Sequence, residues 1–263
     1  MKKLLLLTLT LLFSLPLTAC GSLRPTEEQP RERRLTLEGR RYSYTGDEQD
    51  LQIQDDVLTI RRGGDYYLSG ELKEGAIRIC VPPDACVRLI LEGVTVTSSY
   101  HTPLWVEQAA CLTLELTAGS VNRLTDEARS TTEGSPLPLA CLAAACPILL
   151  CGEGSLIVSG RADTAVASLG TVHLESARLT VSAPSTGIWA RDALMMTGGS
   201  LTVTEARRGV AIPKSDHTVG AITVTGGHLV ALCTETALSA PIVTAPEPLL
   251  DLRAPVRIEA MQK

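Results

Sequence analysis

Aromatic side chains are the scarcest feature of this 263-residue sequence: they make up 3% of it, and the single phenylalanine, Phe13, lies in the first twenty residues. The core must therefore be built from Leu, Val, Ile and Ala. Such a core is unusual for a β-sandwich and typical of thin coils that stack on one another.

Positive charge is also in deficit. The chain has 24 Lys and Arg residues against 29 Asp and Glu residues, and a mature chain without Lys2 and Lys3 would have a net charge of about -7. This balance argues against nucleic acid as a partner. The four histidines show no spacing typical of a metal site, so we expect them in turns or on the surface.

The first twenty residues predict an export signal. Lys2 and Lys3 precede an apolar run that is shorter than an ordinary membrane span, and the segment ends on small residues. Its last residues, Leu-Thr-Ala-Cys, resemble the lipobox of bacterial lipoproteins, which implies acylation of Cys20. Residues 21–34 are charged and contain two prolines, so we expect a flexible tether between the membrane and a domain that starts at Leu35.

A repeat dominates the second half of the chain. The frame GEGSLIV recurs as ESARLTV, TGGSLTV and TGGHLVA, and its leucines are Leu156, Leu179, Leu201 and Leu229. The period is about 22 residues, with one insertion at Pro213–Gly220. Each unit has room for three short strands, as in TAVAS, TVHLE and the leucine frame.

Three strands in each repeat predict an all-β solenoid with three sheets, a parallel β-helix. Alternating residues such as those at 201–204 place Leu and Val inside and Thr outside. Glycine pairs at 198–199 and 226–227 suit a corner, and we expect Gly187 and Gly209 to mark another. A leucine-rich repeat has a similar period, but its consensus and its helical segment are absent.

The open ends of a solenoid need covering. The hairpin-like segment Leu58–Leu72 and the proline-rich segment Ala245–Val256 are the predicted caps.

The order of these pieces resembles a known family. LTIRRGGDYYLSGEL, LEGVTVTSS, LIVSG and the repeated T-G-G-x-L-T-V units are similar to the secreted carbohydrate-binding domain-containing proteins, known as calcium-dependent binders of polygalacturonate. The likeness runs from about Leu58 to Leu238. It implies a right-handed parallel β-helix that binds an acidic polysaccharide without established catalysis.

In that family each coil carries an acidic pair before a glycine and basic residues after it, approximately D-D-G-I-K-x-K-D, and the acids help to hold calcium. This chain keeps few of them. The resemblance leaves Asp163, Asp192 and Glu235 as candidate calcium ligands, which could converge across neighbouring coils or could simply be solvated acids. Calcium prefers six to eight oxygen ligands with several carboxylates, and each corner offers one or two.

Basic residues stand near the same motif. We expect Arg191, Arg207, Arg208 and Lys214 to stack at one corner of successive coils as a basic ladder facing uronate groups. They could equally serve solubility. Trp189 could stack on a sugar ring or pack on its own coil.

An enzyme is the weaker interpretation. A lyase would need a base such as Lys214 or Arg208, and a hydrolase would need two carboxylates, for which Asp163 with Glu205 or Asp192 are candidates. No spacing requires either arrangement, so the sequence identifies no catalytic group.

Seven cysteines follow Cys20, so at least one thiol stays unpaired in any disulfide scheme. Cys80 and Cys86 flank a Pro-Pro turn and could pair. The five-residue spacing of Cys141, Cys146 and Cys151 matches no zinc signature, and we expect these three to be small core residues.

These observations favour a lipid-anchored extracytoplasmic protein that binds an acidic polysaccharide such as polygalacturonate, with calcium as a candidate cofactor. A structural or adhesion solenoid without a ligand is the alternative, and a pectate-lyase-like enzyme comes third.

Overall fold

The computed structural model describes residues 32–127, 137–214 and 219–258. The chain divides into two units, Met1–Pro30 and Arg31–Lys263. The expected export signal, Cys20 and most of the expected tether therefore lie outside the described residues. Among the residues described, no helix is long and apolar enough to cross a membrane.

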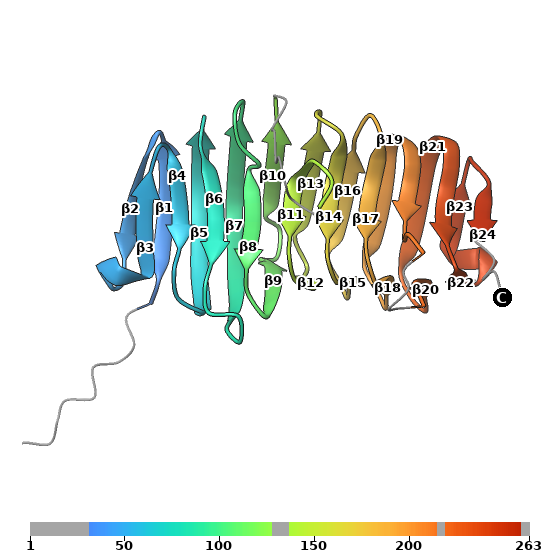
Figure 1. The fold of residues 1–263 in the computed structure, drawn as a ribbon, viewed down its shortest axis with the longest axis horizontal. Helices are drawn as coiled ribbons and strands as arrows, with labels where there is room; N and C mark the ends of the chain where they lie inside the picture. Colours follow the sequence, from blue (N-terminus) through green and yellow to red (C-terminus); the bar gives the residue numbers. More distant parts are fainter. Residues whose placement is uncertain (1–31, 128–136, 215–218, 259–263) are drawn as a thin grey trace, which may run out of the picture. The chain divides into compact units, whose positions relative to one another are not determined.

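The second unit is a parallel β-helix, as predicted. It contains about seven coils of roughly 24 residues, slightly more than the predicted period of 22. Figure 1 shows the strands side by side in chain order, from β1 and β2 to β24. Among the described residues, only two short 3-10 helices interrupt them, η1 (Glu48–Asp50) and η2 (Glu247–Leu249).

Three parallel ladders of strands form three sheets. Sheet 1 consists, in order, of β4 (Val57–Ile60), β6 (Ala76–Cys80), β8 (Leu104–Gln108), β11 (Ala140–Ala144), β14 (Thr164–Ser168), β17 (Thr186–Ala190), the second halves of β19 (Ser200–Ala211) and β21 (His228–Ala240), and β24 (Val256–Ile258).

Sheet 2 follows sheet 1 in each complete coil. It consists of the first halves of β5 (Gly64–Lys73) and β7 (Cys86–Ser98), β9 (Cys111–Leu116), β12 (Ile148–Gly152), β15 (Thr171–Leu174), β18 (Ala193–Met196), β20 (Ala221–Val224) and β22 (Ile242–Thr244).

Sheet 3 completes the coil. It consists of the second halves of β5 and β7, β10 (Val121–Asp126), β13 (Ser155–Gly160), β16 (Arg178–Ser182), the first halves of β19 and β21, and β23 (Leu250–Leu252). We name the turns after the sheets they join: corner 1–2, corner 2–3 and corner 3–1.

The leucine frame of the sequence is the register of sheet 3. Leu156, Leu179, Leu201 and Leu229 pair in turn along the ladder, and all four side chains are buried. Each coil thus buries its apolar face against the next coil, which explains why a core with so few aromatic residues is sufficient.

The glycine predictions are half confirmed. Gly199 and Gly227 turn corner 2–3 with φ of +68° and +82°, and a Cβ on Gly199 would lie 2.2 Å from the carbonyl oxygen of Ala177. The prediction for Gly187 and Gly209 is wrong, because both lie within strands of sheet 1. There a Cβ on Gly187 would lie 2.7 Å from the Gly209 carbonyl oxygen, so close stacking requires the glycine.

The predicted N-terminal cap is also wrong. Leu58–Leu72 lies in β4 and β5, which pair in parallel with β6 and β7 and so belong to the stack. Two antiparallel hairpins lie at this end: β1 (Arg34–Gly39), which also pairs in parallel with β5, pairs with β2 (Arg41–Thr45), and β3 (Leu51–Gln54) pairs with β4. Antiparallel pairing at this end ends the parallel ladder.

A buried carboxylate fastens the N-terminal hairpins. Asp50 is 1% exposed and lies 2.9 Å from the Arg33 guanidinium, and it accepts a hydrogen bond of 2.8 Å from the Tyr44 hydroxyl. Burial raises the pKa of the neighbouring Tyr66 hydroxyl to about 12. Arg33 was expected in the flexible tether, but this contact places it in the folded unit.

At the other end, Ala245–Val256 continues the solenoid. It contains η2 and β23 and reaches the first residue of β24. Both strands pair in parallel with β21. The C-terminal end is therefore finished by short parallel strands.

The predicted pairing of Cys80 with Cys86 is wrong. Cys86 forms a disulfide with Cys111, which is its neighbour in the sheet 2 register, and Cys80 is free. Cys141 and Cys146 are buried as predicted, whereas Cys151 is partly exposed. Burial raises the pKa of Cys146 to about 11, so this thiol is neutral at pH 7 and a poor nucleophile.

Candidate functional site

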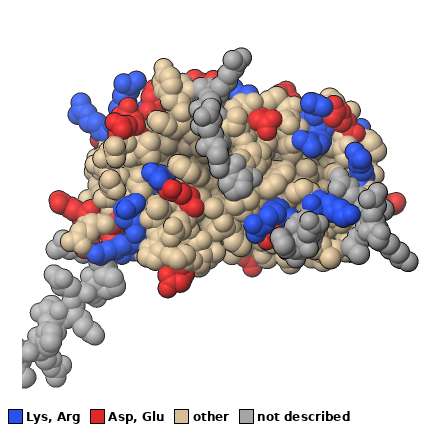
Figure 2. Space-filling view, in the orientation of Figure 1, with Lys and Arg blue, Asp and Glu red and all other residues tan. Residues whose placement is uncertain are grey.

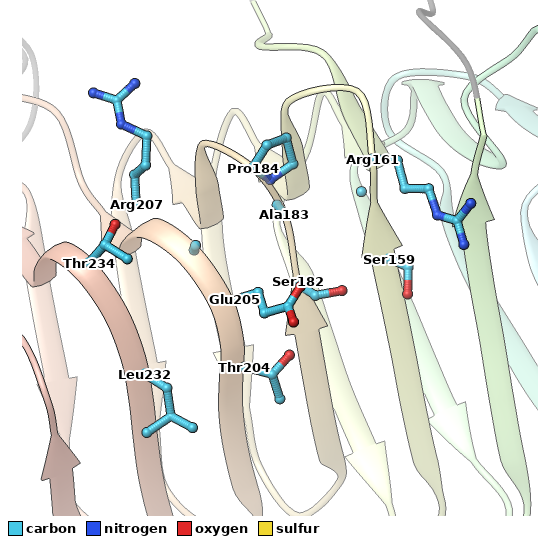
Figure 3. A pocket seen from close by; sticks show the side chains of 12 residues that line it. Ser159, Arg161, Ser182, Ala183, Pro184, Thr204, Glu205, Arg207, Leu232 and Thr234 are labelled. Carbon is cyan, nitrogen blue, oxygen red and sulfur yellow. The ribbon is translucent and has the colours of Figure 1, made fainter.

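A groove of about 700 Å³ crosses four successive coils at corner 3–1. Figure 3 shows the residues that line it. They are Ser159, Gly160, Arg161, Ser182, Ala183, Pro184, Thr204, Glu205, Ala206, Arg207, Leu232 and Thr234. The groove is open to solvent, and each of the four coils contributes one hydroxyl group to it.

Irregular backbone hydrogen bonding accounts for this hollow. In β13 and β16 the chain leaves sheet 3 and turns before it enters sheet 1, but β19 and β21 cross corner 3–1 as continuous strands. The register shifts between Val181 and Ser182, and again between Val203 and Ala206. Such bulges bend a strand and redirect its side chains, and they are frequent beside binding sites.

Two arginines stand at the sides of the groove. Arg161 is largely exposed and lies 3.7 Å from Glu127, and Arg207 is largely exposed and forms a two-pronged pair with Glu235, at 2.7 and 3.2 Å. The hydrogen bond from Arg207 holds the pKa of Glu235 below its usual value. Both pairs are in contact with water and are therefore weak enough to exchange partners with a ligand.

A buried carboxylate of the neighbouring strand β10 fixes the backbone at Arg161. Asp126, at the end of β10, is 2% exposed and accepts hydrogen bonds from the backbone amides of Arg161 and Ala162, the latter at 3.2 Å. Burial raises the pKa of the Asp126 carboxyl. This carboxyl group orders the turn that presents Arg161 to solvent.

Glu205 lies in the middle of the groove. It is in register with Ser182 of the previous coil, and Figure 3 shows its carboxylate directed toward that serine, between Arg161 and Arg207. Glu205 is exposed and forms no ion pair within the described residues. Its two oxygens can accept hydrogen bonds from hydroxyl groups of a ligand.

The predicted basic ladder is wrong, because its four residues lie at two different corners. Arg207 and Arg208 lie at corner 3–1, where sheet 1 begins, whereas Arg191 and Lys214 follow β17 and β19, where sheet 1 ends. The length of a sheet 1 strand, roughly 13 Å, separates the two sets. Figure 2 shows positive and negative residues intermixed on one face, without a continuous basic stripe.

Pairing further reduces the free positive charge. Arg191 is paired with the adjacent Asp192 at 3.0 Å, and Arg207 is paired with Glu235. The exposed guanidinium of Arg208 forms no ion pair or hydrogen bond with another described residue, although its charge helps to lower the pKa of Glu235.

The three candidate calcium ligands do not converge. Asp163 and Glu235 occupy the same position of corner 3–1 but are three coils apart, about 14 Å at the spacing of parallel strands. Asp192 lies at corner 1–2. Across residues 32–127, 137–214 and 219–258, no group of three His, Cys, Asp or Glu side chains could hold a metal ion. These residues do not fit the carboxylate-rich set that calcium requires.

Trp189 packs on the outside of sheet 1 and does not line the groove. It belongs to an apolar cluster with Trp105, Leu137, Ala143 and Ala167. The register places Trp105, Ala143, Ala167 and Trp189 in one column across four coils. Trp189 therefore packs against apolar side chains of neighbouring coils, and its stacking on a sugar ring stays a prediction.

The candidate catalytic groups are also separated. Arg208 begins the sheet 1 part of β19 and Lys214 follows its end, so they share no site. Asp163 and Glu205 lie on different coils, two apart, and Asp192 is at another corner. The structure therefore assembles no catalytic pair from the residues that the sequence suggested.

Sequence reasoning missed Arg161, Ser159 and Ser182 and considered Glu205 only as a hydrolase carboxylate. The sequence did contain a signal for them. They all follow the leucine frame of their repeat directly, and this is the position where the chain passes from sheet 3 to sheet 1. The bulges that widen this corner leave no mark in the alternation of apolar residues, so the groove itself could not be predicted.

Comparison with known proteins fits this architecture. A family model described as carbohydrate-binding domain-containing protein matches residues 54–252. A carbohydrate-binding domain-containing protein of Acetivibrio thermocellus is 25% identical over 187 residues, which are 69% of this chain and 65% of that protein. The chain thus spans just under two thirds of that relative's length.

A solved structure shares the fold. It is described as a polysaccharide lyase-like protein from C. thermocellum, as a gadolinium derivative, and it matches with a TM-score of 0.78 and 20% identity over 88% of this chain and 95% of that chain. At this identity the likeness concerns the fold alone. The family match covers most of the chain, and the protein therefore belongs to the carbohydrate-binding domain-containing family.

Proposed function

We propose that the protein is a lipid-anchored, non-catalytic binder that holds an acidic polysaccharide, such as polygalacturonate, at the outer side of the bacterial membrane. The groove at corner 3–1 is the observation that carries this proposal. It crosses four coils, so a polymer chain lying along the solenoid axis would meet a new set of side chains at every coil.

The lining of the groove suits such a ligand. Ser159, Ser182 and Thr204 offer hydroxyl groups to sugar hydroxyls, and the guanidinium groups of Arg161 and Arg207 can each bind a uronate carboxylate in a two-pronged manner. A carboxylate of the polymer would take the place of Glu235 or Glu127 at these arginines. The exchange replaces one ion pair with another, so the arginine loses little on binding.

The anchor is proposed from the sequence around Cys20. An acylated cysteine at the mature N-terminus would tie the solenoid to the membrane, and the residues after it would give it reach. The mass of the N-terminal peptide of the mature protein checks this part, because an unmodified Cys20 would refute it.

Calorimetric titration tests the binding itself. The protein used would be residues 21–263, which contain the whole folded unit Arg31–Lys263 and therefore the ion pair of Arg33 with Asp50. Polygalacturonate would be titrated in chelator and in excess calcium. We expect binding in chelator, because the groove uses arginines and the described acids form no calcium site. Absence of heat under both conditions would refute polygalacturonate as a ligand, and the proposed function fails if no other acidic polymer binds either.

Two matched variants locate the site. Arg207→Ala removes a groove arginine and should weaken binding about tenfold, the typical contribution of one charge-assisted hydrogen bond. Arg191→Ala removes an arginine with a similar acidic partner at corner 1–2 and should leave the affinity unchanged. Equal losses in both variants would place the ligand elsewhere.

A further inference from the structure

Positive charge occurs on every second coil of the groove. Arg161 follows β13, and Arg207 lies in β19, two coils further along. The coil between them contributes Ser182, Ala183 and Pro184, and the coil after Arg207 contributes Leu232 and Thr234. The two cationic groups are therefore attached about 10 Å apart along the solenoid axis, with an uncharged coil between them.

A negative charge faces this uncharged coil. Glu205 is in register with Ser182, and Figure 3 shows Pro184 between the two arginines and the Glu205 carboxylate beside Ser182. A ligand carboxylate at this level would find no cation and would be repelled by Glu205. A sugar hydroxyl there could donate to Glu205 and accept from Ser182.

The spacing of the two arginines limits the charge pattern of a polysaccharide that fits the groove. In an extended polysaccharide, one sugar ring advances by about the rise of one coil, so a chain that follows the groove presents alternate rings to alternate coils. A homopolymer of uronate whose carboxylates all face the groove would place every second carboxylate beside Glu205. A polymer in which an acidic sugar alternates with a neutral one would place a carboxylate at each arginine and hydroxyl groups at Glu205.

We infer that the groove at corner 3–1 selects an alternating polysaccharide, with one acidic and one neutral sugar in each disaccharide, over a homopolymer of uronate. The inference rests on the proposed function, since it specifies the ligand of the same groove. It gives Glu205 a definite role as the residue that discriminates against a second charge.

The test compares polymers of matched length at one ionic strength in chelator. Hyaluronan and unsulfated chondroitin are alternating polymers, polygalacturonate is the homopolymer, and dextran is the neutral control. We expect at least one alternating polymer to bind about tenfold more tightly than polygalacturonate. Equal binding, or a preference for polygalacturonate, would overturn the inference and leave the proposed function intact. No binding to any acidic polymer would remove the proposed function as well.

Two variants then change the preference. Pro184→Arg adds a cation to the uncharged coil and should shift the ratio of affinities about tenfold toward polygalacturonate. Pro184→Gln makes the same change of backbone without the charge and should leave the ratio unaltered.

Glu205→Gln removes the repulsion and should strengthen polygalacturonate binding while the affinity for the alternating polymer stays within about twofold. Each readout is a ratio measured on one protein, so a loss of folded material cannot imitate it. A rise in affinity for both polymers to the same extent would contradict the proposed spacing.

Discussion

The two halves of the solenoid have the same interior and different surfaces. In the N-terminal half, side chains fasten one coil to the next: Arg88 of β7 contacts both Asp65 of β5 and Glu115 of β9, so one guanidinium joins three coils. Arg78 pairs with Glu107 in sheet 1, and a disulfide joins β7 to β9.

The C-terminal half shows much less fastening. Among the described residues from 137 onward, the ion pairs formed with one another are Arg191 with Asp192, which are adjacent in sequence, and Arg207 with Glu235. The groove lies on these coils. Backbone pairing, the buried Leu and Val ladders and a few side-chain hydrogen bonds keep them stacked, which leaves much of the charged surface available for a ligand. Removal of a side-chain contact between coils should therefore lower the free energy of unfolding more in the N-terminal half than in the C-terminal half.

The largest loss of stability is expected on removal of the disulfide. The double variant Cys86→Ala, Cys111→Ala opens a loop with a sequence separation of 25 residues and should lower the free energy of unfolding by about 3–4 kcal/mol. Urea denaturation would measure it. The wild-type protein in excess reductant should show the same loss, and Cys80→Ala, which removes a free thiol, should not. A loss below about 1 kcal/mol in the double variant would contradict a structural role for this bond.

A smaller loss is expected from the buried carboxylate of the N-terminal hairpins. Asp50→Ala leaves Arg33 and the Tyr44 hydroxyl without their partner. A fully buried pair would cost roughly 3–5 kcal/mol, but Arg33 retains contact with water, so we expect about 2–3 kcal/mol. Glu71→Ala, which breaks the exposed pair with Lys73, is the control and should cost less than about 1 kcal/mol. Similar losses in both variants would show that the buried ion pair of Asp50 contributes no more to stability than an exposed ion pair does.

The smallest effect on stability is expected at the groove. Arg207→Ala breaks the pair with Glu235, which lies at the surface, and exposed pairs contribute less than about 1 kcal/mol. The same variant should lose about tenfold in polysaccharide affinity. Thermal unfolding and calorimetry on one preparation compare the two quantities. A large loss of stability would mean that the groove pair fastens the coils as the N-terminal pairs do.

Much of the fold follows from local pattern. The leucine frame predicted both the parallel β-helix and the actual register of sheet 3, because a side chain that points inward in one coil must lie on its counterpart in the next. Gly187 and Gly209 were misplaced because glycine can serve two purposes: it permits a turn, and it also permits close approach of two backbones within a strand. Only the stacked structure distinguishes them.

Contacts between coils were harder to predict than the strands. Cys80 and Cys86 are near in sequence, but the pair that forms joins residues that are neighbours only after stacking. The basic ladder failed for a related reason. Arg207 and Arg208 precede a sheet 1 strand, whereas Arg191 and Lys214 follow one, and a comparison of their offsets within the repeat would have separated them.

The insertion at corner 1–2 leaves the ladders undisturbed. Pro213–Gly220 lengthens one coil, yet Ala211 pairs with Ser239 before it and Ala193 pairs with Ala221 after it, in the same register as the other coils. The register thus depends on which strands meet and tolerates variation in the number of residues between them. This corner is consequently a place where a foreign peptide, such as an epitope or an affinity tag, could be grafted and displayed without altering the groove at corner 3–1.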